Sequence, residues 1–167
     1  MADVQTDDLY HQDFHQWALD QARAVRGLRD AAARQGNNLP ALDWDNLIEE
    51  LEGLATGVRS ELRNRMITII QHLVKLELSP ASDPRRGWEE TVRRSRFDVE
   101  LLLEDNPSAR REITAIVQAP VMAKAAAMIA DDLMRRGEVS RGIQAPVYTE
   151  AQIFEDWWPG QWEETHP

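Results

Sequence analysis

The chain has 167 residues and a formal net charge of -10 at pH 7, so its length predicts a single domain with a substantial core. An acidic surface repels phosphates, which argues against general nucleic-acid binding. Cysteine is absent, which excludes disulfides and thiolate chemistry and fits a reducing compartment. No apolar run approaches the roughly 20 residues that span a bilayer, and the acidic N-terminus does not resemble a signal peptide. We therefore expect a cytoplasmic protein without a membrane segment.

The first predicted element is a helix over residues 9–33, which follows a flexible N-terminus of residues 1–8. At its start, His11 and His15 are four residues apart on one face of the expected helix, a spacing at which paired imidazoles can hold a metal ion. Asp13 lies between them on another face, and the sequence indicates no third ligand. We favour a polar first turn over a metal site, and we assign no cofactor.

The chain is organised around one long amphipathic helix over residues 42–78. Its apolar residues follow one another by threes and fours and form one predicted buried stripe: Leu47, Leu51, Leu54, Val58, Leu62, Met66, Ile69, Leu73 and Leu76. Asp43 or Asp45 can cap its start, because a short carboxylate accepts from free backbone N–H groups. Gly53 and Gly57 lower helix propensity and allow a bend.

Two polar groups along the long helix are candidate sites. Near its start, Glu49 and Glu50 belong to an acidic cluster that can carry out acid–base chemistry or hold a hard cation. A solvated helix N-terminus is the more ordinary interpretation. Farther along, His72 and Lys75 lie one turn apart beside the apolar stripe. A buried cluster of these two residues with one of the glutamates is the best candidate polar site.

Two further helical regions are predicted, over residues 85–104 and 109–136. Pro120 must kink or split the second region, because proline removes a backbone donor and clashes with the preceding turn. Ser108 is placed to cap this region and Gly137 to close it. The first region has a basic face: Arg85, Arg86, Arg93, Arg94 and Arg96. Such a face can bind a phosphate backbone, but we favour contacts with the acidic face of the long helix or with the acidic tail.

The C-terminal segment from residue 145 is extended and aromatic. Thr149 and Gln152 have the spacing of a capping box for a short helix. Three tryptophans follow: Trp157, Trp158 and Trp162. We expect some of them to dock on the bundle or on a partner, because together they carry much apolar surface. The prediction is an all-α protein, a four- to five-helix bundle in a single domain over residues 9–159, with residues 160–167 as a tail.

Several motifs resemble a known family in their order and spacing. They are DFHQWA at 13–18, LDWDNLIEEL at 42–51, QHLVKL at 71–76, GW at 87–88, DNPS at 105–108, YTEAQI at 148–153 and DWWP at 156–159. The chain resembles the bacterial and cyanobacterial family called domain of unknown function 29, over about residues 10–159. The resemblance implies an all-helical domain with no established activity. Its motifs contain the residues that we take together as candidate binding residues: Trp44, Glu49, Glu50, His72, Lys75 and Trp88.

The chain departs from the family pattern in two places. Pro120 interrupts a segment that is usually one continuous helix, which puts the straightness of that helix in doubt. The loop at residues 34–40 is longer than is common.

The sequence contains no phosphate-binding loop and no nucleophile motif. We predict a small acidic protein–protein interaction or regulatory module, and we favour a protein without enzymatic activity over an enzyme. Its expected partner is a basic protein, as for an antitoxin or immunity protein, an analogy of charge and size alone. The alternative is a metal-dependent or hydrolytic enzyme that uses His11, His15, or the glutamates with His72. A homodimer formed through the long helix or the tail is compatible with either function.

Overall fold

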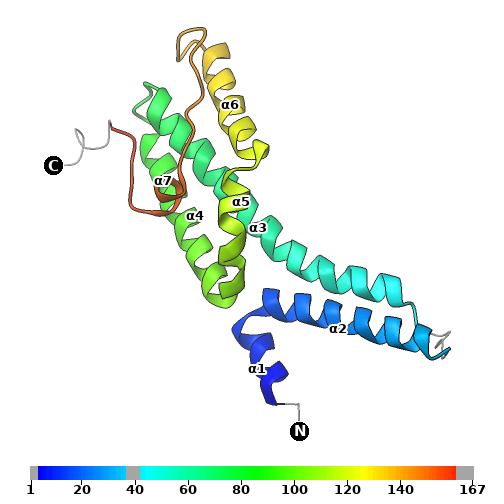
Figure 1. Cartoon of the computed structure of the whole chain (residues 1–167). Coiled ribbons are helices and arrows are strands. Elements are labelled where there is room, and N and C mark those ends of the chain that lie inside the picture. Colours follow the sequence, from blue (N-terminus) through cyan, green and yellow to red (C-terminus); the bar gives the residue numbers. More distant parts are fainter. Residues whose placement is uncertain (1–3, 37–41, 161–167) are drawn as a thin grey trace. The chain divides into compact units, whose positions relative to one another are not determined.

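The computed structural model describes residues 4–36 and 42–160, and within these ranges it contains helices and no strand. The predicted all-α class is therefore confirmed. In chain order the elements are α1 (Val4–Gln12), α2 (Phe14–Arg34), α3 (Trp44–Leu78), α4 (Arg85–Asp105), the 3-10 helix η1 (Pro107–Glu112), α5 (Ile113–Val117), α6 (Pro120–Arg135) and α7 (Glu150–Phe154). Figure 1 shows them coloured along the chain.

Two compact units make up the structure. Unit 1 consists of Met1–Glu61 and Leu102–Arg110, and unit 2 consists of Leu62–Leu101 and Arg111–Pro167. The long helices α3 and α4 each contribute residues to both units. The single domain expected over residues 9–159 stays a prediction.

In unit 1, the prediction of one continuous helix over residues 9–33 is wrong, because this region consists of two helices that meet at Asp13. Helix α1 ends at Gln12, and α2 begins at Phe14. Asp13 has an extended backbone, with φ −157°, and its Oδ1 accepts a hydrogen bond from the backbone N–H of Gln16 at 2.9 Å. This carboxylate caps a new helix, which is the preferred role of a short acidic side chain at such a position.

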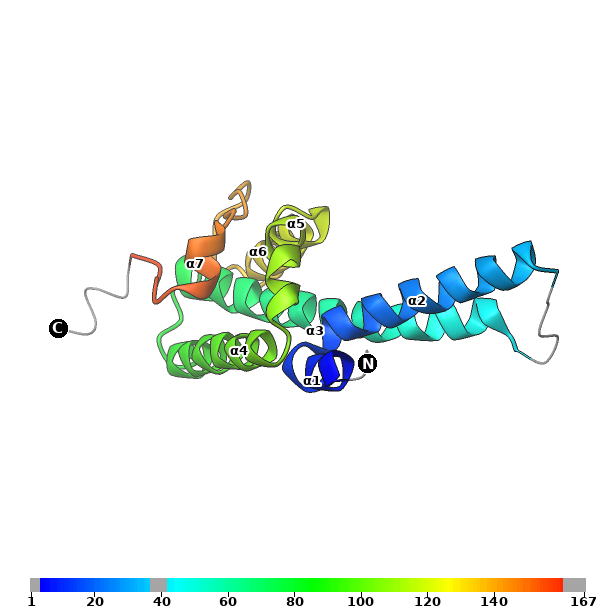
Figure 2. The same ribbon diagram turned by 60° about the horizontal axis from the view of Figure 1, so that its bottom comes forward.

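The rest of unit 1 is a helical hairpin. Helix α2 and the first part of α3 run side by side in opposite directions (Figures 1 and 2). The residues buried along these two helices are mostly small: Ala18, Ala22, Ile48 and Ala55. Alanine side chains allow two helix backbones to approach closely, so the two helices pack along a narrow line of contact.

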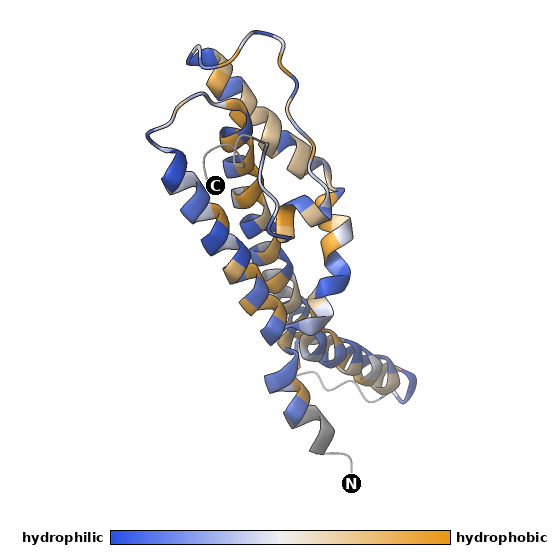
Figure 3. Cartoon of the chain, turned by 90° about the vertical axis from the view of Figure 1, so that its left-hand side faces the viewer, coloured by the Kyte–Doolittle hydropathy of each residue, from blue (hydrophilic) through white to orange (hydrophobic). Residues whose placement is uncertain are grey.

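Unit 2 holds the larger core. The second half of the predicted stripe on α3 is fully buried: Leu62, Met66, Ile69, Leu73 and Leu76. Helix α4 adds Val92 and Val99 to this core. Hydrophilic residues dominate α4 in Figure 3, and hydrophobic ones recur among them at intervals. The amphipathic pattern of α4 therefore directs one face of the helix into unit 2.

The predicted break at Pro120 is confirmed. Helix α5 ends at Val117, and α6 begins with Pro120 in its first turn. Ala119 has the extended φ/ψ of −66° and 140° that a residue before proline adopts. No single described helix is long and apolar enough to cross a membrane. The pair Pro107–Val117 and Pro120–Arg135 meets that criterion only when both helices are taken together across their break.

Three predicted helix ends are also confirmed. Asp43 Oδ1 accepts from the backbone N–H of Asn46 at 3.3 Å at the start of α3. Gly137, with φ 76°, follows α6, and the next N–H bonds back to the carbonyl of Leu133 at 2.9 Å. Thr149 and Gln152 form the capping box of α7. These local signals determine where the helices begin and end.

Candidate functional site

In unit 1, Asp13 and His15 join Asn106 and Ser108 in a buried polar cluster, which we call the Ser108 clasp. His11 and His15 lie on different helices, so the predicted pairing on one helical face is wrong; His11 is exposed and His15 is buried. The His15 Nδ1 lies 2.8 Å from Ser108 Oγ, and the backbone N–H of His15 donates to Asn106 Oδ1 at 3.1 Å. Asp13 accepts twice from Ser108, from the hydroxyl at 2.8 Å and from the backbone N–H at 2.7 Å.

The clasp also corrects the predicted role of Ser108. This residue lies inside η1, and its side chain bonds to Asp13 and His15 instead of capping a following helix. The four members of the clasp come from two places about 90 residues apart in the sequence. Hydrogen bonding at the α1–α2 junction is therefore coupled to the stretch that follows α4.

The clasp contains a serine, a histidine and an aspartate, but their order does not suit hydrolysis. In a catalytic triad the aspartate orients the histidine, and the histidine accepts the serine proton. Here the single hydroxyl proton of Ser108 is donated to Asp13, and an ionised carboxylate only accepts. His15 Nδ1 must therefore donate to Ser108 Oγ, so the histidine ring is no base for this hydroxyl. The geometry is that of a structural link.

The remaining candidate residues fall into two groups. Trp44, Glu49 and Glu50 lie in unit 1, and both glutamates are exposed. His72 and Lys75 lie in unit 2 with Trp88. A buried cluster that includes Glu49 or Glu50 is therefore wrong, because neither carboxylate is buried.

Within unit 2, His72 and Lys75 make separate contacts. His72 Nδ1 donates to the carbonyl of Thr68 at 2.9 Å, a bond within the same helix. Burial lowers the pKa of His72 below its ordinary value, and the charge of Lys75 lowers it further. Lys75 Nζ lies 5.9 Å from the centre of the Trp88 ring, within the range of a cation–π contact. Two of the family-motif residues, Lys75 and Trp88, are thus brought together.

Metal binding finds no support in the geometry. Among residues 4–36 and 42–160, no three histidine, aspartate or glutamate side chains are grouped so that they could hold a metal ion. Of the described histidines, His15 and His72 make the hydrogen bonds given above, and His11 is exposed.

The basic face of α4 serves the C-terminal segment of unit 2. Arg96 donates to the backbone carbonyls of Gln152 and Ile153, each at 2.9 Å, and of Trp157 at 2.8 Å. The guanidinium carbons of Arg93 and Arg96 lie 5.2 and 5.0 Å from the centre of the Trp158 ring. These contacts support the prediction that the basic face of α4 binds within its own chain. The expected partners were acidic side chains, whereas the observed ones are backbone carbonyls and an indole ring. Burial lowers the pKa of Arg96.

The tail therefore docks on its own chain over its described part. The ring centre of Trp157 lies 6.0 Å from that of the buried Tyr148, whose hydroxyl donates to Glu77 Oε2 at 2.7 Å. Burial, together with the Glu77 carboxylate, raises the pKa of Tyr148 far above its usual value. Trp162, the third tail tryptophan, lies outside the described residues.

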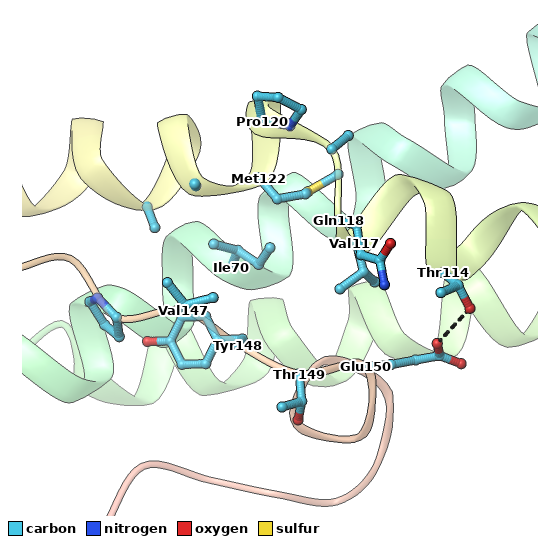
Figure 4. Close-up of a pocket in the computed structure, with 14 residues that line it drawn as sticks. Ile70, Thr114, Val117, Gln118, Pro120, Met122, Val147, Tyr148, Thr149 and Glu150 are labelled. Carbon is cyan, nitrogen blue, oxygen red and sulfur yellow. Dashed lines mark hydrogen bonds between the residues drawn. The ribbon is translucent and has the colours of Figure 1, made fainter.

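Unit 2 also contains a groove of about 390 Å³ between α6 and the extended segment before α7 (Figure 4). Its lining is largely apolar, with Ile70 of α3 at its base and Thr114, Gln118 and Glu150 at one end. Thr114 Oγ1 donates to Glu150 Oε2 at 3.3 Å. No sequence motif pointed to this groove, because the bend at residues 118–120 and the segment at 146–150 form it together.

The most exposed apolar feature of unit 1 lies on the hairpin. Leu28 of α2 is 61% exposed, and Leu47 and Leu54 of α3 are 38% and 42% exposed. The sequence predicted that Leu47 and Leu54 are buried. That prediction is wrong, because the contact with α2 runs through Ile48 and Ala55 instead.

The exposed leucines lie on one side of the hairpin. Leu47 and Leu54 each precede a buried position of α3 by one residue, about 100° around the helix. Trp17 precedes the buried Ala18 in the same way, and Leu28 keeps the i, i+4, i+7, i+11 register from Trp17. Because the two helices are antiparallel, the same offset turns both stripes to the same side of the pair. We call this surface the leucine face; its members are Trp17, Ala24, Leu28, Leu47, Leu51, Leu54 and Val58.

Two ion pairs show which residues of α2 lie opposite which residues of α3. Arg26 Nη2 lies 2.5 Å from Glu52 Oε1, and Arg29 Nη1 lies 2.7 Å from Asp45 Oδ1. This register places Leu28 beside the start of α3, where Leu47 lies. The two stripes therefore run next to each other. The signal was present in the sequence, because α3 is apolar at both 47/54 and 48/55, a stripe wider than one neighbouring helix can cover.

Comparison with known proteins identifies the family of this chain. The profile of Domain of unknown function DUF29 matches residues 9–158. The chain belongs to the DUF29 family. A crystal structure of an alpha-helical protein of unknown function from Rhodospirillum rubrum is similar to this DUF29 chain, with a TM-score of 0.62 and 23% sequence identity over 88% of this chain and 90% of that one. That likeness supports the helical fold alone, and no curated protein matches the DUF29 chain.

Proposed function

We propose that this DUF29 chain is a protein–protein interaction module, and that its docking surface is the leucine face of unit 1. The observation that carries the proposal is the exposure of Leu28, Leu47 and Leu54 on one side of a two-helix hairpin. Contiguous apolar surface of this kind marks interaction sites in proteins, and well-packed apolar anchors supply most of the binding energy at an interface.

The proposal is favoured over the enzymatic alternative on chemical grounds. The Ser108 clasp has the wrong order for nucleophilic catalysis, since Ser108 donates to Asp13 and His15 donates to Ser108. No group able to hold a metal occurs in the described part of the chain. A homodimer formed through the same face is the competing occupant.

The test is affinity capture from the native host with the whole chain. Leu54→Asp places a charge in the middle of the leucine face, and Leu101→Asp makes the same change on α4 at a leucine that is also 42% exposed. A stoichiometric partner that Leu101→Asp retains and Leu54→Asp loses supports the proposal. Equal retention by both variants, with thermal unfolding unchanged, contradicts it.

A further inference from the structure

We propose that the groove of unit 2 binds a small apolar amine, a molecule with one primary ammonium head and an apolar body. The body lies along the apolar lining of the groove, and the head lies at the end that carries Glu150. Every residue of the lining belongs to unit 2. The inference therefore goes beyond the docking function proposed for unit 1, and the two stand or fall separately.

The apolar part of the groove is preformed. Ile70 at its base is buried, as are Met122, Ala126 and Tyr148 in its lining. Tyr148 contributes its ring, because its hydroxyl already donates to Glu77, which is not part of the lining. The core of unit 2 holds these residues in place, so a ligand finds the site without rearranging it. The volume of about 390 Å³ is within the range of small-molecule sites, which are mostly apolar with a few placed polar groups.

The free polar groups of the lining gather at one end. Figure 4 shows Thr114, Gln118 and Glu150 there, and the Glu150 carboxylate is directed toward Thr114. Thr149 is polar too, but its hydroxyl is engaged in the capping box of α7. Among the described residues that line the groove, Glu150 alone is charged at neutral pH. A molecule that lies in the groove therefore meets apolar atoms along its body and a single negative charge at one end.

The protein does not neutralise the charge of Glu150. Within residues 4–36 and 42–160 no lysine, arginine or histidine pairs with its carboxylate, and the hydrogen bond from Thr114 Oγ1 is long at 3.3 Å. The side-chain amide of Gln118, at the same end, makes no hydrogen bond in that part of the chain. A carboxylate only accepts and an amide oxygen accepts too, so both can receive N–H groups from one ammonium, which has three donors. An anionic head would instead meet a like charge.

Three probes of one chain length that differ in the head group test the inference against the full-length chain: octylamine, octanol and octanoate. Isothermal titration calorimetry at low salt should show octylamine binding at least about threefold tighter than octanol, and octanoate binding weakest, because an exposed ion pair adds a modest gain. The advantage of the amine should shrink in high salt. Backbone amide shifts measured by NMR should move in residues 114–126 and 146–150 and stay fixed in α2.

Two pairs of variants locate the binding. Glu150→Gln removes the charge and keeps an oxygen that can accept from Thr114, so it should lower the affinity for octylamine to that for octanol and leave octanol unchanged. Glu155→Gln makes the same change at an exposed carboxylate outside the lining and should have no effect. Ala123→Leu enlarges a side chain of the lining and should weaken all three probes. Ala127→Leu, at an exposed alanine one turn farther along α6, should weaken none.

The ordinary alternative is a solvated carboxylate at the start of α7, since Glu150 is exposed and lies in the first turn of that helix. It predicts that the three probes bind alike, or that Glu150→Gln and Glu155→Gln weaken octylamine equally, and either result overturns the inference. So does binding that Ala123→Leu leaves intact in a chain whose thermal unfolding is unchanged, or no saturable binding of octylamine at all. None of these results bears on the leucine face, whose partner capture is tested separately.

Discussion

The two units use the same helix in opposite ways. In unit 2, α3 buries Leu62, Met66 and Leu73 beneath α4 and the segments that follow. In unit 1, the same apolar pattern on the same helix leaves Leu47 and Leu54 partly exposed, because the contact with α2 runs through Ile48 and Ala55. Periodicity specifies which residues share a face, and the number of neighbouring elements decides whether that face is buried. We assign the proposed docking function to unit 1, where part of this apolar face stays exposed.

The strongest test of this difference between the units is to replace one leucine in each of them. Leu73→Ala leaves a cavity in unit 2 and should lower the free energy of unfolding by about 3 kcal/mol. Leu54→Ala removes an exposed side chain and should change it by less than about 0.5 kcal/mol. Urea denaturation followed by circular dichroism measures both. Equal losses would mean that the leucine face is covered in solution.

The Ser108 clasp should matter more to unit 1 than its leucines do. Ser108→Ala removes the hydroxyl that joins Asp13 to His15, and two buried polar side chains each lose a partner. The expected loss is about 2 kcal/mol of unfolding free energy, with faster amide exchange at the α1–α2 junction. Ser140→Ala, at an exposed serine, is the control and should be neutral. Unchanged exchange at residues 11–17 in Ser108→Ala would refute the role of the clasp.

A smaller effect is expected where the tail docks in unit 2. Arg96→Lys cannot serve three carbonyls, because an ammonium is a point donor without the planar guanidinium fork. We expect a loss of about 1 kcal/mol, a red shift of tryptophan emission, and faster proteolysis after α7. Arg94→Lys changes an exposed arginine of the same helix. If both variants were cleaved at the rate of the wild type, Arg96 would not hold the tail.

The smallest expected effect is on the pH dependence of stability, and it concerns His72 of unit 2. The folded pKa of His72 lies below its ordinary 6.5, so the unfolded chain binds its proton first as the pH falls. Its contribution to stability is present above about pH 6.5 and is lost as the pH falls toward the folded pKa. His72→Gln should flatten the pH dependence of unfolding in that window. The exposed His11, changed to Gln, should leave it intact, and a wild-type slope in His72→Gln would contradict the assignment.

Much of the fold followed from local signals. Asp43, Pro120, Gly137 and the Thr149 capping box act within one turn of the chain, so their positions were readable from the sequence. The break at Asp13 was missed because a carboxylate inside an apolar period does not reveal by itself that it is a cap.

The candidate sites were harder to predict, because they depend on distant contacts. Ser108 meets Asp13 across 95 residues, and no spacing rule links them. The resemblance grouped Glu49 with His72, whereas the structure puts the first in solvent in unit 1 and the second beside Thr68 in unit 2. The leucine face could not be predicted, because periodicity alone does not say which part of the wide apolar pattern of α3 lies against α2.

Site-specific photocrosslinking in the native host tests the docking claim most directly. A benzoylphenylalanine in place of Leu54 reports what touches the leucine face, and the same group in place of Leu101 reports an equally exposed position on α4. The account predicts one discrete adduct with another protein from position 54 and none from position 101. No adduct from position 54, or an adduct only with a second copy of this chain, would contradict it.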